Sequence, residues 1–259
     1  MSLRTDLNIT GEKRAVVTGA SSGIGAATVT RLRAQDWDVI AVARREDRLK
    51  ELQERTGAVP LACDITIADD VARLGEFVAE RGVLHALVNN AGGAFGQEPV
   101  AEADINKWQQ MYDVNVIGTL RITRELLPQL RASNAGDVVV VTSTAAHDTY
   151  PGGGGYVAAK HAERIIANTL RQELVGEPVR IMEVAPGMVM TEEFSLTRFA
   201  GDQERAEAVY EGVAEPLVAD DIAEVIEFML SRPHHVNLDS VIVRPRAQAT
   251  NTLVARADS

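Results

Sequence analysis

The chain is poor in cysteine, in aromatic residues and in positive charge. Cys63 is the only cysteine among 259 residues, which excludes intrachain disulfides and thiolate-cluster metal sites and fits a reducing compartment. Aromatic residues make up 4% of the chain, and the formal net charge is −11. A protein that binds the phosphates of nucleic acid needs a basic face. We therefore expect no nucleic-acid partner, and we expect Cys63 to be a small buried apolar side chain.

Long apolar runs are absent as well. No segment approaches the ~18 consecutive apolar residues that span a membrane, and the polar start has no apolar signal core. We expect a polar tail over residues 1–12, no membrane partner and a cytoplasmic location. No interior linker rich in Pro, Gly or Ser divides the chain, and 46% of its residues are hydrophobic. The sequence therefore predicts a single domain over residues 1–259.

What the sequence does contain is an alternation of short apolar runs and longer amphipathic stretches. Each run is typical of a strand buried on both faces, and the stretches between them are typical of crossover helices. Strands joined in this way pair in parallel with right-handed connections. The sequence predicts an α/β fold of the Rossmann type, a doubly wound parallel sheet of about seven strands with helices on both faces. The runs occupy residues 15–18, 38–43, 59–63, 84–89, 137–143, 179–185 and 240–244.

A glycine-rich stretch follows the first run. Residues 18–25 read TGASSGIG, and a helical pattern comes next. Glycines at this point permit a tight turn and let the backbone approach a pyrophosphate, with the helix N-terminus facing the anion. The spacing is G-x-x-x-G-x-G instead of the G-x-G-x-x-G of other dinucleotide folds, and the G-K-[ST] of a nucleotide-hydrolysing P-loop is missing. The stretch predicts a phosphate site.

An arginine pair, Arg44 and Arg45, follows the second run. At this place a dinucleotide fold that uses NAD has an acid on the ribose 2′-hydroxyl. Because a planar guanidinium pairs well with phosphate oxygens, the arginines favour NADP over NAD. A surface pair at a helix start is the alternative, and Glu46 or Asp47 could still bind a 2′-hydroxyl. After the third run, Asp64 is expected either to accept the adenine amino group or to cap the next helix.

Polar side chains also end the fourth and fifth runs. Residues 89–93 read NNAGG, and paired amides can tie neighbouring strand ends together while the small residues leave room for a flat cofactor ring. A simple turn is the alternative, since Asn and Gly are turn residues. The fifth run ends at Ser143, thirteen residues before Tyr156. Its hydroxyl could share a substrate oxygen with the phenol.

Tyr156 and Lys160 form a candidate acid–base pair. Four glycines, residues 152–155, precede the tyrosine, and the lysine follows one helical turn later, so phenol and ammonium share a face. A free phenol has a pKa near 10, and a cation about 5 Å away favours the phenolate by roughly 3 kcal/mol at an effective dielectric of about 20. We expect Lys160 to lower the pKa of Tyr156 toward working pH and the glycines to give the preceding loop unusual backbone conformations. A solvated helix face that carries both residues by chance is the alternative.

Taken together, these motifs resemble the short-chain dehydrogenase/reductase family. TGASSGIG, NNAG, DVNVIG, Ser143, YVAAK and APG occur in the order and spacing of that family, over residues 13 to about 244. The resemblance implies a nicotinamide coenzyme and a catalytic group of Asn115, Ser143, Tyr156 and Lys160. In that group Ser143 and Tyr156 hold the substrate oxygen, Lys160 also holds the nicotinamide ribose, and Asn115 organises a water chain.

The resemblance also implies a set of coenzyme-binding residues. They are Gly19, Ser21, Ser22, Gly23, Ile24, Gly25, Arg44, Arg45, Asp64, Ile65, Asn90, Ala91, Gly92, Tyr156, Lys160, Pro186, Gly187, Val189 and Thr191. No metal is expected, because the adjacent His234 and His235 lack the i, i+4 partner of a helical metal site.

The segment after the sixth run, residues 186–215, is expected to be the substrate loop. Its pattern TEEFS…RFAGD…A…Y resembles NADP-dependent 3-hydroxy acid dehydrogenases that act on serine and allo-threonine. An acidic substrate needs a cation in the pocket, and Arg198, Arg205 and His147 are the candidates; a solvated surface position is the alternative for each.

The sequence thus predicts an oxidoreductase that transfers a hydride between NADP(H) and the carbinol or carbonyl carbon of a small polar substrate, a 3-hydroxy acid such as serine or allo-threonine. A reductase of another ketone or aldehyde, and a non-catalytic NADP(H)-binding sensor, are the alternatives. Apolar residues beyond one core face, around residues 101–131 and in the helix at Tyr156, fit packing between subunits, and the resemblance to the family implies a homo-oligomer, a tetramer or a dimer.

Overall fold

Parallel β-strands form the centre of the structure. The computed structural model describes residues 13–257, so the predicted polar tail lies outside the described residues. Seven strands form one sheet in the order β3-β2-β1-β4-β5-β6-β9, and each neighbouring pair is parallel. The predicted doubly wound sheet is confirmed. The strands are β1 (Arg14–Thr18), β2 (Asp38–Ala43), β3 (Val59–Ala62), β4 (Ala86–Asn89), β5 (Gly136–Val141), β6 (Val179–Pro186) and β9 (Ser240–Val243).

All seven apolar runs fall on these strands. The run 38–43 matches β2 at both ends, and the others differ from their strands by one or two residues at an end. The ends differ by two residues after β5 and before β4, where Leu84 and His85 are buried but precede Ala86, the first residue of β4. His85 already donates to the Arg14 carbonyl oxygen and accepts from the Asp137 N–H, so the buried run begins only one residue before the hydrogen bonds of the sheet.

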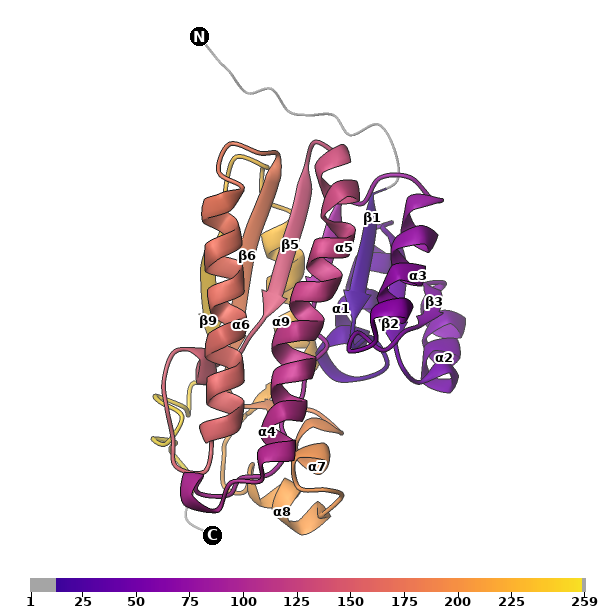
Figure 1. The fold of residues 1–259 in the computed structure, drawn as a ribbon. Coiled ribbons are helices and arrows are strands. Elements are labelled where there is room, and N and C mark those ends of the chain that lie inside the picture. The colour runs from indigo at the N-terminus through magenta and orange to yellow at the C-terminus, as the bar shows by residue number, and fades with distance from the viewer. Residues whose placement is uncertain (1–12, 258–259) are drawn as a thin grey trace.

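Helices cover both faces of this sheet (Figure 1). On one face α1 (Gly23–Ala34), α2 (Glu46–Thr56) and α9 (Ala219–Leu230) share an apolar core with the strands. On the other face the core belongs to α3 (Ala68–Ala79), α5 (Gly118–Ala132) and α6 (Gly154–Glu173). The strand order reverses between β1 and β4, so the crevice of the fold opens beyond the carboxyl ends of these two strands.

Short elements gather at that end of the molecule. Figure 1 shows α7 (Phe194–Arg198) and α8 (Gln203–Ala208) beyond the strand ends to which the arrows point. The strands before and after them in the chain, β7 (Val189–Met190) and β8 (Leu217–Val218), pair as a small two-stranded sheet. The sequence does not predict β7 and β8, because two residues carry no periodicity. No helix of the described part of the chain is both long and apolar enough to cross a membrane.

The glycine run before Tyr156 is not a loop throughout. Gly154 and Gly155 are the first residues of α6, and within residues 152–155 only Gly152 has a positive φ, +73°. A Cβ on Gly155 would lie 2.4 Å from Met111 Cε and 2.9 Å from Trp108 Nε1. The expected backbone freedom therefore applies to Gly152 alone. The later glycines are required because α6 begins in close contact with the side chains of α4 (Ile105–Tyr112).

Candidate active site

A large cavity, of about 1110 Å³, lies beyond the carboxyl ends of the strands. Its walls come from the β1–α1 turn, the ends of β2, β4 and β5, and the segment that follows β6. Ser143 and all but one of the predicted coenzyme-binding residues line it. Gly25 and Asn115 do not line it, because both are buried behind its wall.

The glycines of the β1–α1 turn allow the backbone to approach closely. Gly19 has φ +64°, and a Cβ there would lie 2.9 Å from Ala91 Cα. A Cβ on Gly25 would lie 2.4 Å from the Gly19 carbonyl oxygen. Larger residues at these two positions would push the turn away from the end of β4. The turn and the β4 end therefore form one narrow cradle at the crevice.

Asn90 ties the ends of β1 and β4 together, as predicted for an amide at this position. Its Nδ2 donates to the Thr18 carbonyl oxygen at 2.9 Å, and its own backbone N–H donates to Thr18 Oγ1 at 3.0 Å. Asn89 does not join these strands; it donates to Thr123 Oγ1 on α5 at 2.9 Å. The paired amides thus have two different partners, and only Asn90 shapes the cradle.

The arginine pair lies at one end of the cavity. Arg45 makes two hydrogen bonds with the Glu193 carboxylate, at 2.6 and 2.7 Å, and also donates to Ser21 Oγ at 2.8 Å. Arg44 is exposed, lines the same cavity and makes no ion pair with any described residue. Asp64 lines the cavity too, but it accepts from Thr66 in a local turn and does not cap α3, which begins at Ala68.

Tyr156 and Lys160 share one face of α6, as predicted. Lys160 Nζ lies 5.9 Å from the centroid of the Tyr156 ring, and both side chains are buried. Burial nevertheless raises the pKa of Tyr156 above its ordinary value, and Lys160 opposes that rise without cancelling it. The expected effect of Lys160 on the pKa of Tyr156 is present, but Lys160 does not outweigh burial, because removing the phenolate from water costs more than one nearby cation returns.

A buried carboxylate accompanies the lysine. Lys160 Nζ donates to Glu163 Oε2 at 2.6 Å and to the Val141 carbonyl oxygen at 3.1 Å. Thr119 donates to the other oxygen of Glu163 at 3.1 Å. Burial opposes the charge on Lys160, but Glu163 and, to a smaller extent, Tyr156 raise the pKa of Lys160 above its usual range. The lysine therefore remains a cation at neutral pH.

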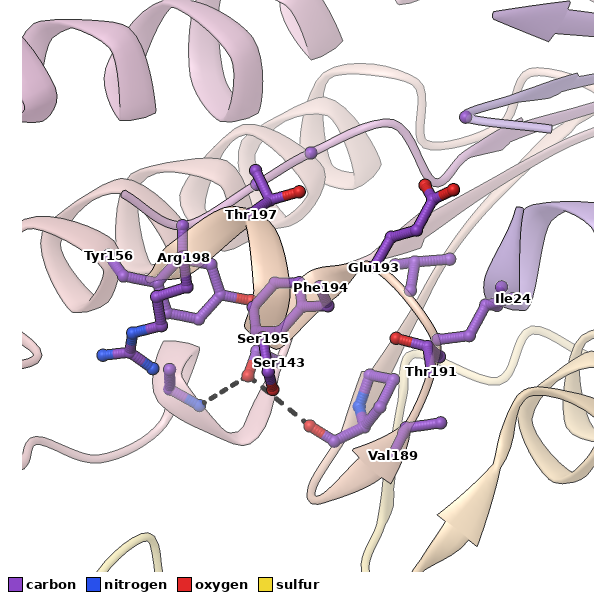
Figure 2. Close-up of a pocket in the computed structure, with 18 of the residues that line it drawn as sticks. Ile24, Ser143, Tyr156, Val189, Thr191, Glu193, Phe194, Ser195, Thr197 and Arg198 are labelled. Atoms are coloured by element: carbon purple, nitrogen blue, oxygen red, sulfur yellow. Dashed lines mark hydrogen bonds between the residues drawn. The ribbon is translucent and has the colours of Figure 1, made fainter. Parts of the chain in front are cut away.

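Ser143 lies at the other side of the phenol, at the start of the 3-10 turn η3 (Thr144–Ala146). Its Oγ accepts from the Ala145 N–H at 3.1 Å and approaches the Pro186 carbonyl oxygen at 3.5 Å, the two contacts drawn in Figure 2. After burial and Lys160, Ser143 has a smaller effect on Tyr156 and lowers the pKa of the phenol. Both side chains line the cavity.

Asn115 shapes the wall from behind. It belongs to the π-helical turn η2 (Asp113–Ile117) that joins α4 to α5. Its Nδ2 donates to the carbonyl oxygens of Met111, at 2.7 Å, and Gly93, at 2.9 Å. A side chain that bonds the carbonyl four residues earlier competes with the normal helical hydrogen bond and favours the wider π turn. Asn115 thereby fixes the loop after β4; its water chain stays a prediction.

Two of the three candidate cations for a substrate carboxylate line the cavity. Arg198 donates from Nε to the Gly96 carbonyl oxygen at 3.2 Å, and its Nη2 is buried without a hydrogen-bond partner. Arg205 is exposed at the rim, with its guanidinium 4.4 Å from the Phe199 ring centroid. His147 is not such a cation: its Nε2 lies 3.0 Å from Glu183 Oε1 and it does not line the cavity.

Two observations show that these residues suit a dinucleotide. At Gly19 and Gly25 the backbone segments are so close that a Cβ at either position would collide with its neighbours. At Arg45 and Ser22 the Glu193 carboxylate already occupies an anion position. Comparison with known families points to the same kind of site: the family model described as "short chain dehydrogenase" matches residues 13–198.

The chain belongs to the short-chain dehydrogenase family. It is 54% identical over 241 residues to an uncharacterised oxidoreductase of Mycobacterium tuberculosis, covering 93% of this chain and 94% of that protein. It is 39% identical over 237 residues to a serine 3-dehydrogenase of Agrobacterium fabrum, covering 90% and 94%. The closed form of a serine dehydrogenase complexed with NADP+ matches it with a TM-score of 0.89 and 33% identity, over 95% of this chain and all of that one.

For this short-chain dehydrogenase the sequence did not single out Glu163, Glu183 or Glu193. The sequence could have indicated Glu163, since it stands three residues after Lys160 on the same helix face, where the two side chains can form an ion pair. Glu183 carries a weaker signal, a carboxylate in a strand whose only other charged residue is Arg180. Glu193 has none, because its partner Arg45 is 148 residues away in sequence.

Proposed function

We propose that this short-chain dehydrogenase oxidises the hydroxyl-bearing carbon of a small 3-hydroxy acid, such as serine or allo-threonine, with NADP+, and reduces the corresponding carbonyl with NADPH. The coenzyme assignment is supported by Arg44 and Arg45 and by the NADP+ of the matching serine dehydrogenase. The acid assignment is carried by one observation: Arg198 lines the same cavity as Tyr156 and has a buried guanidinium nitrogen without a hydrogen-bond partner.

The position of Arg198 supports a substrate of this kind. In Figure 2 Arg198 lies on the opposite side of Tyr156 from Ile24, Thr191 and Glu193, which stand toward the coenzyme end. Its Nε is held by Gly96, and its guanidinium lies 5.6 Å from the Tyr150 ring centroid. An arginine fixed on one edge leaves the other edge for a carboxylate, which matches its planar geometry. In this proposal a short hydroxy acid binds Arg198 through its carboxylate and directs its hydroxyl toward Tyr156 and Ser143.

Each residue of the catalytic group has a role in this proposal. Ionised Tyr156 takes the proton of the substrate hydroxyl during oxidation, and neutral Tyr156 returns it to the alkoxide during reduction. Ser143 donates a hydrogen bond to the same substrate oxygen and stabilises its developing charge. Lys160 stabilises the phenolate and holds the nicotinamide ribose, while Asn115 positions the β4 loop. Bound NADP+ supplies the hydride acceptor at the nicotinamide C4.

The substrate assignment is tested by comparing acids with neutral analogues. NADPH absorbance is followed with serine, allo-threonine, 3-hydroxybutyrate, the amide of 3-hydroxybutyrate, simple ketones and sugars. We expect Arg198→Met to lower kcat/KM for the acids by about 30-fold or more, because a buried charge would lose its partner, and to change the amide little. Arg205→Met is the matched control, since its guanidinium is exposed. If the wild-type protein reacts only with bulky apolar ketones, the hydroxy-acid assignment fails.

We also propose that the protein is a cytoplasmic homo-oligomer that packs through α4, α5 and α6. Ile105, Leu120 and Ile165 on these helices are exposed apolar side chains. Packing against a second copy would remove them from water. Light scattering tests this assembly: Ile165→Lys is expected to lower the molar mass of the particle toward that of the monomer, and an unchanged mass speaks against this interface.

A further inference from the structure

Glu193 and Arg45 join two parts of the site that are far apart in sequence. Glu193 stands between β7 and α7, in the predicted substrate loop, and Arg45 follows β2. The two terminal guanidinium nitrogens of Arg45 donate to the two carboxylate oxygens, Nη1 to Oε1 at 2.6 Å and Nη2 to Oε2 at 2.7 Å. Two parallel charge-assisted bonds of this kind are the strongest geometry that arginine offers an anion.

Hydroxyl groups complete the surroundings of this carboxylate. Ser22 Oγ donates to Glu193 Oε2 at 2.8 Å, and Arg45 Nη2 also lies 3.1 Å from Ser22 Oγ. Ser22 is the residue before α1, so the carboxylate also faces the amino-terminal end of that helix. The hydrogen bond from Arg45, followed by that from Ser22, keeps the pKa of Glu193 below its ordinary value. Glu193 is therefore an anion at neutral pH.

The same donors suit a phosphate group. A ribose 2′-phosphate is an anion whose oxygens accept hydrogen bonds from guanidinium and hydroxyl donors, as a carboxylate does. Arg45 and Ser22 cannot serve Glu193 and a phosphate at full strength together, because the two anions would compete for the same N–H and O–H groups and repel each other. Arg44 stands beside them and has no ion pair among the described residues.

We propose that Glu193 is a coenzyme-specificity residue whose carboxylate competes with the 2′-phosphate of NADP(H) for Arg45 and Ser22. Binding of NADP(H) opens the contact and releases the start of the substrate loop from the β2 end. NAD(H) has no 2′-phosphate and leaves the contact closed. The inference rests on NADP as the coenzyme and not on the identity of the substrate.

Release of Glu193 would change the position of residues that pack against Tyr156. The next residue, Phe194, places its ring 5.7 Å from the Tyr156 ring, edge to face, and Thr191 lies against the Gly23 turn. The segment from Thr191 to Phe194 thus runs from the phosphate cradle to the phenol. A ligand can shift such a segment only by the difference in its affinity for the two arrangements, and the 2′-phosphate provides that difference here.

The test measures coenzyme binding without turnover. Kd values of NADPH and NADH are determined by fluorescence titration for the wild type, Glu193→Gln and Glu192→Gln. Glu192 is the matched control, because it is an adjacent exposed glutamate that does not line the cavity. We expect Glu193→Gln to bind NADPH about fivefold more tightly, as is usual for loss of a competing partly exposed ion pair, and to bind NADH as the wild type does.

The other outcomes would overturn the proposal. Weaker or unchanged NADPH binding by Glu193→Gln would show that the carboxylate does not compete with the phosphate. An equal fall in the Kd of NADPH and of NADH, or an equal effect of Glu192→Gln, would mean that the change comes from the loss of one negative charge anywhere near the site. Glu193→Ala serves as a second variant, and it is expected to show the same preference for NADPH over NADH as Glu193→Gln.

Discussion

The ammonium nitrogen of Lys160 lies 2.6 Å from a carboxylate oxygen of Glu163, three residues further along α6. Both side chains are almost fully buried, at 5% and 0% exposure. The pair has opposite effects on Tyr156: burial raises the pKa of the phenol most, Lys160 lowers it and Glu163 raises it. Besides burial, the pKa of Tyr156 therefore depends on a cation whose charge is partly compensated, and removal of the carboxylate should change that pKa.

Glu163→Gln should shift the pH profile of oxidation. A glutamine keeps both partners, since its amide can accept from Lys160 and donate to Thr119 Oγ1. Without the negative charge the pKa of Tyr156 falls, so the rise of kcat/KM with pH moves to lower pH, by about one pH unit. The measurement is log kcat/KM for NADP+-dependent oxidation between pH 6 and about 10.5.

Few titratable groups surround Glu163, so a shift of the pH profile can be assigned to a particular group. The charged or titratable groups near it are Lys160 and Tyr156 on α6 and Glu183 on β6. Glu183 is itself held by Thr142 and His147. Glu163→Asp keeps the charge and should restore a profile close to that of the wild type. A rise displaced to higher pH in Glu163→Gln would mean that Lys160 has lost its proton, contrary to this account.

Tyr156→Phe should abolish turnover and leave coenzyme binding intact. The substitution removes the proton acceptor but preserves the ring that packs edge to face against Phe194. Loss of a general acid–base group lowers kcat by about a thousandfold. Steady-state rates and the Kd of NADPH, measured on the same preparation, separate the two effects. Activity within a few-fold of the wild type would remove Tyr156 from its proposed role.

Arg44→Gln should weaken NADP binding selectively. Arg44 is exposed at the cavity and has no competing carboxylate among the described residues, so a phosphate can use its full hydrogen-bonding capacity. We expect the Kd of NADPH to rise about tenfold, in line with hydrogen bonds to charged groups, and the Kd of NADH to stay within about twofold. A comparable loss for both coenzymes would place Arg44 elsewhere on the dinucleotide.

Gly155→Ala should destabilise the fold. The new Cβ would lie 2.4 Å from Met111 Cε and 2.9 Å from the Trp108 indole nitrogen, and overpacking of this kind costs about 1–3 kcal/mol. Urea-induced unfolding gives the free energy of unfolding. Gly154→Ala is the comparison, since its nearest contact would be 3.0 Å to the Trp108 ring, and we expect a smaller loss there. Equal stability of Gly155→Ala and the wild type would contradict the packing account.

The sequence could predict the sheet and most of the cavity lining because both follow from local pattern. Buried strands need apolar runs, and parallel strands bring their carboxyl ends to one edge. For this reason Gly19, Asn90, Ser143 and Tyr156 could be assigned to one site from positions scattered over the chain. The same logic fails at β7 and β8, whose pairing depends on a fold already formed.

The order of amino acids is enough to predict the parallel α/β fold, the chemistry available at each strand end and the shared helical face of Tyr156 and Lys160. Three contacts follow only from the folded chain: His147 pairs with Glu183, Arg198 has a nitrogen without a hydrogen-bond partner, and Glu193 pairs with Arg45. Only in the folded chain does burial outweigh Lys160 at the phenol. The physical reason is that periodicity acts between neighbours in the chain, whereas desolvation and ion pairing depend on which distant side chains share a space without water.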